Sequence, residues 1–245
     1  MKYALLLSGG IDKNANKTRY NNDLGFAYEV LSSKYSFDDI KVLYYDGSDI
    51  KYLDKKISSS IATFQMVDKY FENLSHTVKP EDTFFILVSN HGSEPDAHVD
   101  EYNIRLYGKA AHIKMSYFSD LLNNINCKKI IVLGQCHSGA ILSYNITNSI
   151  IVTACSKSEK SYFTKDKQNI DINGEMYSYE YDEFLLHFVS YLNGSYPNGN
   201  QINYDNSIVN AFNYAKTHDI WAAPNGFCGC KETPMIFPKG VDMSL

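Results

Sequence analysis

The sequence predicts an α/β fold with a mostly parallel central sheet. Short apolar runs rich in β-branched residues recur along the chain, and most do not alternate apolar with polar residues, which is typical of parallel strands buried on both faces. Longer segments between them carry apolar residues every three or four positions, as amphipathic helices do. Strands that alternate with helices in this way indicate a parallel sheet. The chain has 245 residues, of which 44% are hydrophobic, so it can bury a full core, and we expect residues 1–245 to form a single domain.

The expected elements follow one another as alternating strands and helices. The strands are expected at residues 3–8, 40–45, 83–89, 129–133 and 149–155. The helices are expected at residues 22–34, 57–73, 116–124, 181–192 and 205–217, with Asn22 or Asp23 capping the first and Ser116 the third. A hairpin is expected around residues 104–107. Residues 156–175 contain almost no apolar side chains, and we expect them to form a long loop that is functional or disordered.

Charge and hydropathy limit the classes of partner. The net charge is −5, and Lys and Arg form no long run, which argues against a nucleic-acid-binding surface. No segment approaches the roughly 18 consecutive apolar residues of a membrane span. Residues 1–8 contain an apolar run too short for a signal peptide and are expected to form the first core strand. The sequence therefore predicts a cytoplasmic protein, or a secreted one if a leader has been removed.

The cysteines do not form an evident disulfide framework. Their number, five, is odd and their positions are scattered. Cys127 and Cys155 flank or lie in apolar strands and are expected to be buried structural thiols. Cys228-Gly229-Cys230 resembles half of a metal site or a redox pair, but no second Cys or His pair stands at the spacing of a zinc site. We therefore expect neither a metal nor a cofactor.

Two predicted strands end in residues suited to nucleophilic catalysis. Residues 129–133 lead through Gly134 to Cys136, and residues 83–89 lead to His91, which stands 45 positions before Cys136. In open α/β sheets the carboxyl ends of strands are where ligands bind. A thiolate is a nucleophile and a nearby imidazole is its usual activator. The backbone N–H groups of Gly92 and Cys136 are candidates for an oxyanion hole, since Gly92 allows close approach.

These segments resemble a known family. Asn90-His91-Gly92 and Gln135-Cys136-His137-Ser138-Gly139, each after an apolar strand, resemble the catalytic segments of the caspase–legumain group of cysteine peptidases, and within it most closely the legumain-type branch. The spacing is comparable with caspases, in which the His lies about 50 residues before the Cys. The resemblance implies a three-layer α/β/α sandwich of caspase–haemoglobinase type. It also implies hydrolysis of peptide or protein substrates through an acyl-enzyme on Cys136, with His91 as the proton carrier.

The resemblance also implies a pocket for the substrate residue before the scissile bond, P1. Arg19 is similar to the family's pocket Arg, and residues 154–162, with Ser161 and Tyr162, to the stretch along the substrate backbone. Gln135 and Asp182 are further candidates for substrate contact, and Asp or Asn is expected at P1, because a guanidinium pairs well with planar oxygens. The chain departs from legumains in having Gly134 two positions before the nucleophile, where they carry an acid. It also has Lys17 where they carry an Asn that supports the His.

Several alternatives remain open at this stage. The same acyl-enzyme resolved by an amine would make the protein a transamidase, and a degenerate domain would be an interaction scaffold, although such domains usually lose the Cys or His. A zinc site is a third alternative, formed by His91, His98, Cys136 and His137. Arg19 can instead form a surface ion pair with Asp23, one helical turn away.

The predicted loop suggests regulation by cleavage. Residues 156–175 are rich in Lys, Asn and Asp, including Asn169, Asp171 and Asn173. Because Asp or Asn is the expected P1 residue, this segment is a candidate for self-cleavage, and the protein for a zymogen.

Overall fold

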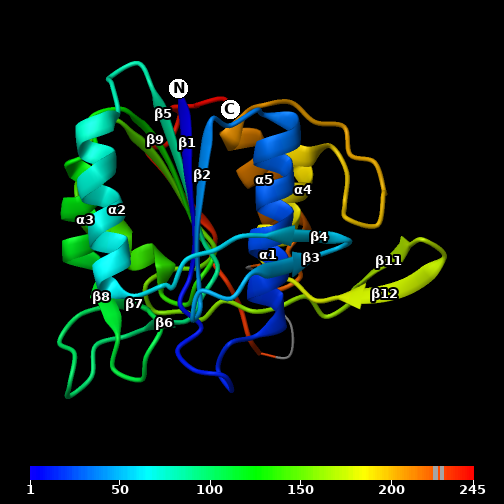
Figure 1. Cartoon of the computed structure of the whole chain (residues 1–245), viewed down its shortest axis with the longest axis horizontal. Coiled ribbons are helices and arrows are strands. Elements are labelled where there is room, and N and C mark those ends of the chain that lie inside the picture. Colours follow the sequence, from blue (N-terminus) through cyan, green and yellow to red (C-terminus); the bar gives the residue numbers. More distant parts are fainter. Residues whose placement is uncertain (223–225, 227–228) are drawn as a thin grey trace.

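The computed structural model describes residues 1–222, 226 and 229–245, which form a six-stranded central sheet covered by helices on both faces (Figure 1). The strand order is β13-β10-β9-β5-β1-β2, in which neighbouring strands run parallel except for the pair of β10 and β13. The sheet strands are β1 (Lys2–Ser8), β2 (Asp39–Tyr44), β5 (Thr83–Val88), β9 (Lys128–Leu133), β10 (Ser149–Thr153) and β13 (Met235–Phe237). The predicted α/β sandwich with a mostly parallel sheet is confirmed.

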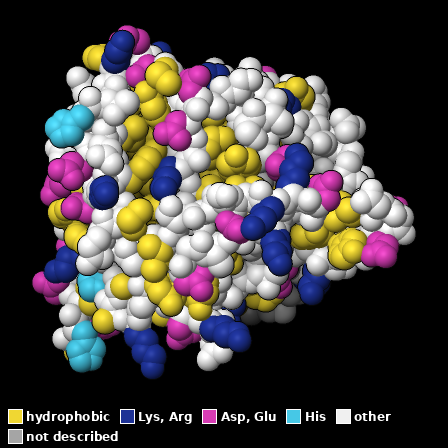
Figure 2. Space-filling model, in the orientation of Figure 1, with side chains coloured by type: hydrophobic (Ala, Val, Ile, Leu, Met, Phe, Trp, Pro, Cys, Tyr) yellow, Lys and Arg dark blue, Asp and Glu magenta, His cyan; other side chains and the backbone are white. Residues whose placement is uncertain are grey.

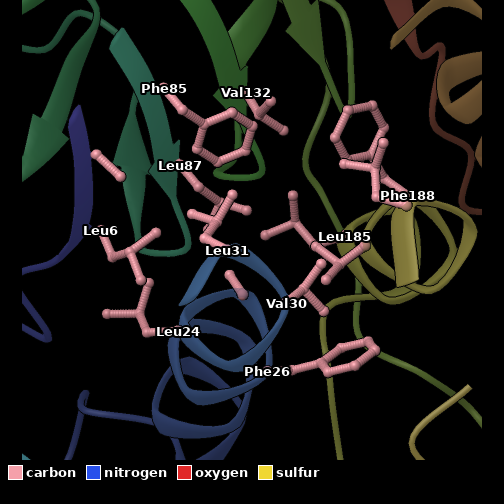
Figure 3. Packing of buried hydrophobic residues seen from close by; sticks show 14 of the residues in the cluster. Leu6, Leu24, Phe26, Val30, Leu31, Phe85, Leu87, Val132, Leu185 and Phe188 are labelled. Atoms are coloured by element: carbon pink, nitrogen blue, oxygen red, sulfur yellow. The ribbon is translucent and has the colours of Figure 1, made fainter. Parts of the chain in front are cut away.

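Helices form the two outer layers. Figure 1 shows two of them on one face of the sheet, α2 (Phe64–Thr77) and α3 (Met115–Asn123). The other face carries α1 (Thr18–Glu29) with its π-helical extension Val30–Lys34, α4 (Glu183–Asn193) and α5 (Ile208–His218). Each face buries its own hydrophobic cluster. Figure 3 shows Leu6, Phe85 and Val132 from the sheet directed towards Leu24 of α1 and Leu185 of α4, and this packing fixes the two helices over the sheet.

Within the described residues, three smaller sheets surround the core. One is the hairpin of β3 (Ile50–Tyr52) and β4 (Lys55–Ile57). Another joins β6 (Gly92–Ser93), β7 (Asn103–Arg105) and β8 (His112–Lys114) and contains the hairpin predicted around residues 104–107. The third is the hairpin of β11 (Gln168–Ile172) and β12 (Glu175–Tyr179), which projects from the body of the molecule (Figure 1).

The first helix begins earlier than predicted. Helix α1 starts at Thr18, so Asn22 and Asp23 lie inside it and are buried instead of capping it. Their side chains serve tertiary contacts: Asn22 Nδ2 donates to the Glu180 carbonyl at 2.8 Å, and Asp23 accepts a hydrogen bond from Ser89 Oγ. The prediction was wrong because a short polar side chain within a helix can bond to another element as readily as to its own N-terminus. Arg19 consequently belongs to the first turn of a helix.

The start of α2 was also wrong, whereas α3 lies within one residue of the prediction but has a different cap. Residue 57 lies in β4, and α2 begins only at Phe64, where Thr63 Oγ1 accepts a hydrogen bond from Met66 N at 3.4 Å. In α3 the cap position is Lys114. Ser116 instead donates from Oγ to Glu101 at 2.8 Å, so its hydroxyl is used in a tertiary contact.

The predicted loop at residues 156–175 is partly a β-hairpin. Strand β11 begins at residue 168, and the turn is Asn173-Gly174, where both residues have positive φ, 56° and 87°. Asn-Gly is the preferred pair for such a two-residue turn. The prediction missed the hairpin because the strands are polar and largely exposed, and only Ile170 is buried. Figure 2 shows the hairpin as a protrusion on the surface, where Met176 and Tyr177 are exposed.

Candidate active site

Cys136 and His91 lie beyond the ends of two adjacent strands. Strands β5 and β9 pair in parallel with Val88 opposite Leu133, and Gly134 N donates to the Val88 carbonyl at 2.8 Å. The loops after these strands are in contact, because a Cβ atom at position 92 would lie 2.0 Å from the Cys136 carbonyl oxygen. Only glycine fits there. The two motifs predicted to share one edge of the sheet do so.

His91 is held from the loop before α1. Its Nε2 lies 2.9 Å from the Ala15 carbonyl oxygen, and its ring meets Tyr20 edge-on at 5.3 Å. Because a carbonyl only accepts, Nε2 carries the proton and Nδ1 is left with its lone pair. Burial lowers the pKa of His91 below its ordinary value, which favours this neutral form. The main chain of Ala15 supports the ring, whereas Lys17, at the position of the legumain Asn, bonds to the Asn14 carbonyl.

Cys136 is a partly exposed free thiol next to a backbone segment from the loop after β10. Ser161 N donates to Cys136 Sγ at 3.3 Å, and Sγ lies 3.8 Å from the Ser161 carbonyl oxygen. The following residue, His137, has a left-handed backbone and places its Nδ1 2.9 Å from the Lys157 carbonyl. The His137 ring is therefore held against the segment that follows β10.

Arg19 projects from the first turn of α1. Its guanidinium carbon lies 4.8 Å from the centre of the Tyr20 ring and 5.5 Å from that of Phe163. Its Nε is buried without a hydrogen-bond partner. Arg19 takes part in none of the ion pairs of the described residues, so the alternative of a salt bridge with Asp23 is not realised. A guanidinium with unpaired donors between two aromatic rings is suited to bind a planar acceptor.

Two buried carboxyl groups lie behind Arg19. Asp182 caps α4 by accepting a hydrogen bond from Leu185 N at 3.1 Å, and its Oδ2 lies 3.5 Å from Ser161 Oγ. The backbone N–H of Asp182 donates to Asp23 Oδ1 at 3.1 Å. Burial raises the pKa of Asp23 to about 7, and burial and then the neighbouring Asp23 raise the pKa of Asp182 well above its usual range.

Asp23 was missed as a site residue. The sequence suggests only a helix cap or a surface partner at this position, but Asp23 is 3% exposed and joins the end of β5 to the start of α4. Its position four residues after Arg19 on one helix face is the signal that both side chains point to the same place.

Positions 134 and 135 are both buried. A Cβ atom at Gly134 would lie 2.4 Å from Leu185 Cδ1, so the acid that legumains carry at this position has no room here. Gln135 is completely buried, and neither atom of its amide has a hydrogen-bond partner. Its Cγ packs beneath Gly92. The prediction that Gln135 contacts substrate therefore does not fit this geometry, since the side chain offers no exposed surface.

Tyr162 is held by an acid from the C-terminal part of the chain. Tyr162 N donates to Glu232 Oε1 at 2.5 Å, and the Tyr162 carbonyl accepts from Glu183 N at 3.1 Å. The Tyr162 ring stacks on Trp221 at 4.9 Å, while Trp221 Nε1 donates to the Phe163 carbonyl at 3.1 Å. Glu232 is fully buried, and the sequence analysis missed it as a site residue. Its only signal was an acid directly before Thr233-Pro234.

Of the other described cysteines, only Cys230 is a partly exposed free thiol like Cys136. Cys127 and Cys155 are buried, as predicted, and burial raises the pKa of Cys155 to about 12. Cys228, half of the Cys-Gly-Cys motif, lies outside the described residues. Within the described ranges, no group of three or more His, Cys, Asp or Glu residues is arranged to hold a metal ion. None of the helices in those ranges has the length and apolar character needed to cross a membrane.

Comparisons with known proteins place this site in a family. Residues 2–185 match the model of the peptidase C13 family, whereas a search of curated proteins gives no match. Among solved structures, the chain is similar to protein GSU0716 from Geobacter sulfurreducens, with 13% sequence identity, a TM-score of 0.61 and coverage of 96% of this chain and 92% of that one. At that identity the likeness concerns the fold alone. The family match spans well over half of the residues, and the chain therefore belongs to the peptidase C13 family, the legumain family of cysteine peptidases.

Proposed function

We propose that this protein is a cysteine endopeptidase that cleaves peptide bonds through a thioester on Cys136. One observation carries the proposal: the loop that holds His91 and Gly92 contacts the loop that holds Cys136 beyond the ends of two adjacent strands, and the thiol is partly exposed. Of the other cysteines in the described residues, Cys127 and Cys155 are buried, and Cys230, although partly exposed, does not follow a strand that pairs with β5, so Cys136 is the one suited to attack a substrate beside His91.

The steps follow from the groups at the site. Cys136 Sγ attacks the carbonyl carbon of the scissile bond, and the thiol proton passes to His91 Nδ1. The backbone N–H groups of Gly92 and Cys136 stabilise the oxyanion. The tetrahedral intermediate collapses as the C–N bond breaks, and the imidazolium of His91 gives its proton to the leaving amine. Water, deprotonated by His91, then attacks the thioester and releases the acid and the thiol.

Arg19, Asp182 and Ser161 are proposed to bind a P1 side chain of Asp or Asn. Arg19 is partly exposed, and its guanidinium supplies N–H donors for the side-chain oxygen. Asp182 Oδ2 lies 3.5 Å from Ser161 Oγ. The Asp182 carboxyl group accepts a hydrogen bond from an amide N–H when it is ionised and donates one when it is protonated. Tyr162 is assigned to the strand that runs along the substrate backbone.

The test is digestion of a diverse peptide library read by mass spectrometry. We expect cleavage after Asp or Asn that is absent in Cys136→Ala and at least roughly tenfold weaker in Arg19→Lys, which keeps the charge but loses the planar fork. Cleavage after Lys or Arg would agree with the proposed mechanism but contradict the proposed P1 pocket. Products joined to an added amine would indicate a transamidase. If no product depends on Cys136, the remaining interpretation is a non-catalytic interaction scaffold.

Self-processing is proposed at the tip of the β11–β12 hairpin. Asn173 is exposed at the turn, and Asn169 and Asp171 lie on β11. The test measures the intact mass of the purified parent protein and of the variants Cys136→Ala and Asn173→Gln. A cut after Asn173 in the parent chain alone supports the proposal, and an intact, fully active chain contradicts it.

A further inference from the structure

A buried acid outside the part of the chain that matches the family model contacts the strand next to Cys136. The family match ends at residue 185, whereas Glu232 lies just before β13. Its Oε1 accepts the hydrogen bond of Tyr162 N at 2.5 Å, and its side chain has no exposed surface. The peptidase mechanism described above gives this carboxyl group no role.

The hydrogen bonds of residues 161–164 divide between two edges. On the inner edge, Thr164 N donates to the Tyr181 carbonyl at 2.8 Å and the Tyr162 carbonyl accepts from Glu183 N, so this edge pairs with the start of α4. The Tyr162 N–H also points away from the thiol, and Glu232 is its partner. The main-chain groups of Ser161 and Phe163 face the other way, towards Cys136 Sγ and Trp221 Nε1. The outer edge beside the thiol is therefore the one on which an extended peptide can add as a strand.

Glu232 is itself held in place. Its backbone N–H donates to the Trp221 carbonyl at 2.7 Å. The next residue, Thr233, donates from Oγ1 to Glu159 Oε1 at 2.9 Å, and Glu159 Oε2 accepts from Ser156 N at 3.1 Å. Residues 232–233 thus hold the segment between Ser156 and Tyr162 at two points.

We propose that Glu232 is a positioning residue for the peptidase reaction, whose carboxyl group fixes the Tyr162 peptide and so aligns the outer edge of Ser161–Phe163 with Cys136. The proposal rests on the proposed function. Without the Glu232 oxygen, the buried Tyr162 N–H has no partner and the segment shifts to find one. A substrate that spans several residues before the scissile bond needs this edge, whereas one with a single residue uses only the thiol and the P1 pocket.

The experiment compares two substrates on matched variants. Glu232→Gln keeps an oxygen that accepts from Tyr162 N, and Glu232→Leu has a similar volume without an acceptor. Lys231→Leu, at an exposed neighbouring position, is the control. The substrates are an N-acylated tetrapeptide and an ester of an N-acyl amino acid, both carrying the P1 residue, Asp or Asn, that the library digestion selects, and each is measured against Cys136→Ala.

For the tetrapeptide, we expect kcat/KM to fall roughly tenfold or more in Glu232→Leu and to stay within roughly threefold of the parent in Glu232→Gln. For the ester, we expect little change in kcat/KM in either variant. Equal losses on both substrates, or no loss on the tetrapeptide, would overturn the role of Glu232 while leaving the peptidase intact. A parent chain that hydrolyses neither substrate would overturn the proposed function and this proposal together. If Glu232→Leu does not fold, Glu232→Asp, which draws the oxygen back by one methylene, should show the same selective loss, and its absence would overturn the proposal.

Discussion

The backbone N–H of Asp182 donates a hydrogen bond to the carboxylate of Asp23, so two buried acids from different helices share one corner of the proposed P1 pocket. Asp23 is tied in turn to Ser89 at the end of β5, two residues before His91. The pair thus connects the pocket to the strand that carries the proton carrier. Two carboxyl groups in such a place cannot both ionise at low energetic cost, because each charge is desolvated and repels the other.

The first prediction concerns how the P1 preference changes with pH. Burial holds the pKa of Asp182 well above its usual range and that of Asp23 at about 7, so in acid the pocket is uncharged apart from Arg19 and accepts a P1 Asp carboxylate. As the pH rises through about 7, the pocket gains negative charge and repels that carboxylate, while a P1 Asn amide gains an acceptor. The ratio of kcat/KM for Asp over Asn substrates should therefore fall as the pH rises. A ratio independent of pH between 5 and 8 would contradict this.

The second prediction concerns stability and Asp219. This residue is 5% exposed, its Oδ2 has no hydrogen-bond partner, and burial raises its pKa from 3.8 to about 7. The folded state holds the proton more tightly than the unfolded state, so the stability contributed by protonated Asp219 is complete below about pH 4 and is lost as the pH rises to 7. The loss amounts to roughly 4 kcal/mol at most.

Asp219→Asn should remove this slope, because the amide does not titrate and its oxygen still accepts from Trp221 N. Urea unfolding at intervals from pH 4 to 8 measures it. The comparison uses the difference between parent and variant, since Asp23 titrates in both. Parallel stability curves for the two proteins would show that folding does not raise the pKa of Asp219.

Individual residues show which parts of the fold and of the candidate site could be predicted from the sequence. The strands were placed well because buried parallel strands are short apolar runs, and the ends of β5 and β9 therefore located His91 and Cys136. The start of α2 was wrong because the apolar spacing continues back to Ile57, which lies in β4. The start of α1 and the cap of α3 were wrong for another physical reason. Polar side chains such as Asn22, Asp23 and Ser116 have local and tertiary partners of similar energy, and the sequence does not rank them.

The residues missed at the site depend on contacts between distant segments. Glu232 reaches Tyr162 from 70 positions further along the chain, and no local pattern connects them. Gln135 was predicted to contact substrate, but it lies after the end of β9 and its side chain packs beneath Gly92, a contact between two loops that no local pattern shows. Gly134 was noted as a departure from legumains, and only packing explains it, because Leu185 fills the space.

This packing gives the third prediction. Gly134→Ala places a methyl group 2.4 Å from Leu185 Cδ1, so the variant should lose about 1–3 kcal/mol of unfolding free energy. Leu185→Ala alone leaves a cavity and should lose about 2–5 kcal/mol. In the double variant the two methyl groups fit together, so the combined loss should be smaller than the sum of the single losses. Additive losses in chemical denaturation would mean that the Val88 carbonyl, 3.1 Å away, is the true obstacle.

The last prediction concerns Trp221 and the outer edge beside Cys136. Trp221 Nε1 donates to the Phe163 carbonyl, the group that would accept from an added peptide strand. A substrate strand must displace this hydrogen bond. Trp221→Phe keeps the ring stacked on Tyr162 but removes the donor, so it should lower KM for a tetrapeptide by roughly threefold to tenfold.

Because Trp221 is the only tryptophan in the chain, its fluorescence reports the displacement directly. Titration of Cys136→Ala with the uncleaved tetrapeptide should shift the emission, and an N-acyl-Asn ester that does not reach the edge should not. An unchanged spectrum at saturating tetrapeptide would mean that substrate binds elsewhere than on the Ser161–Phe163 edge.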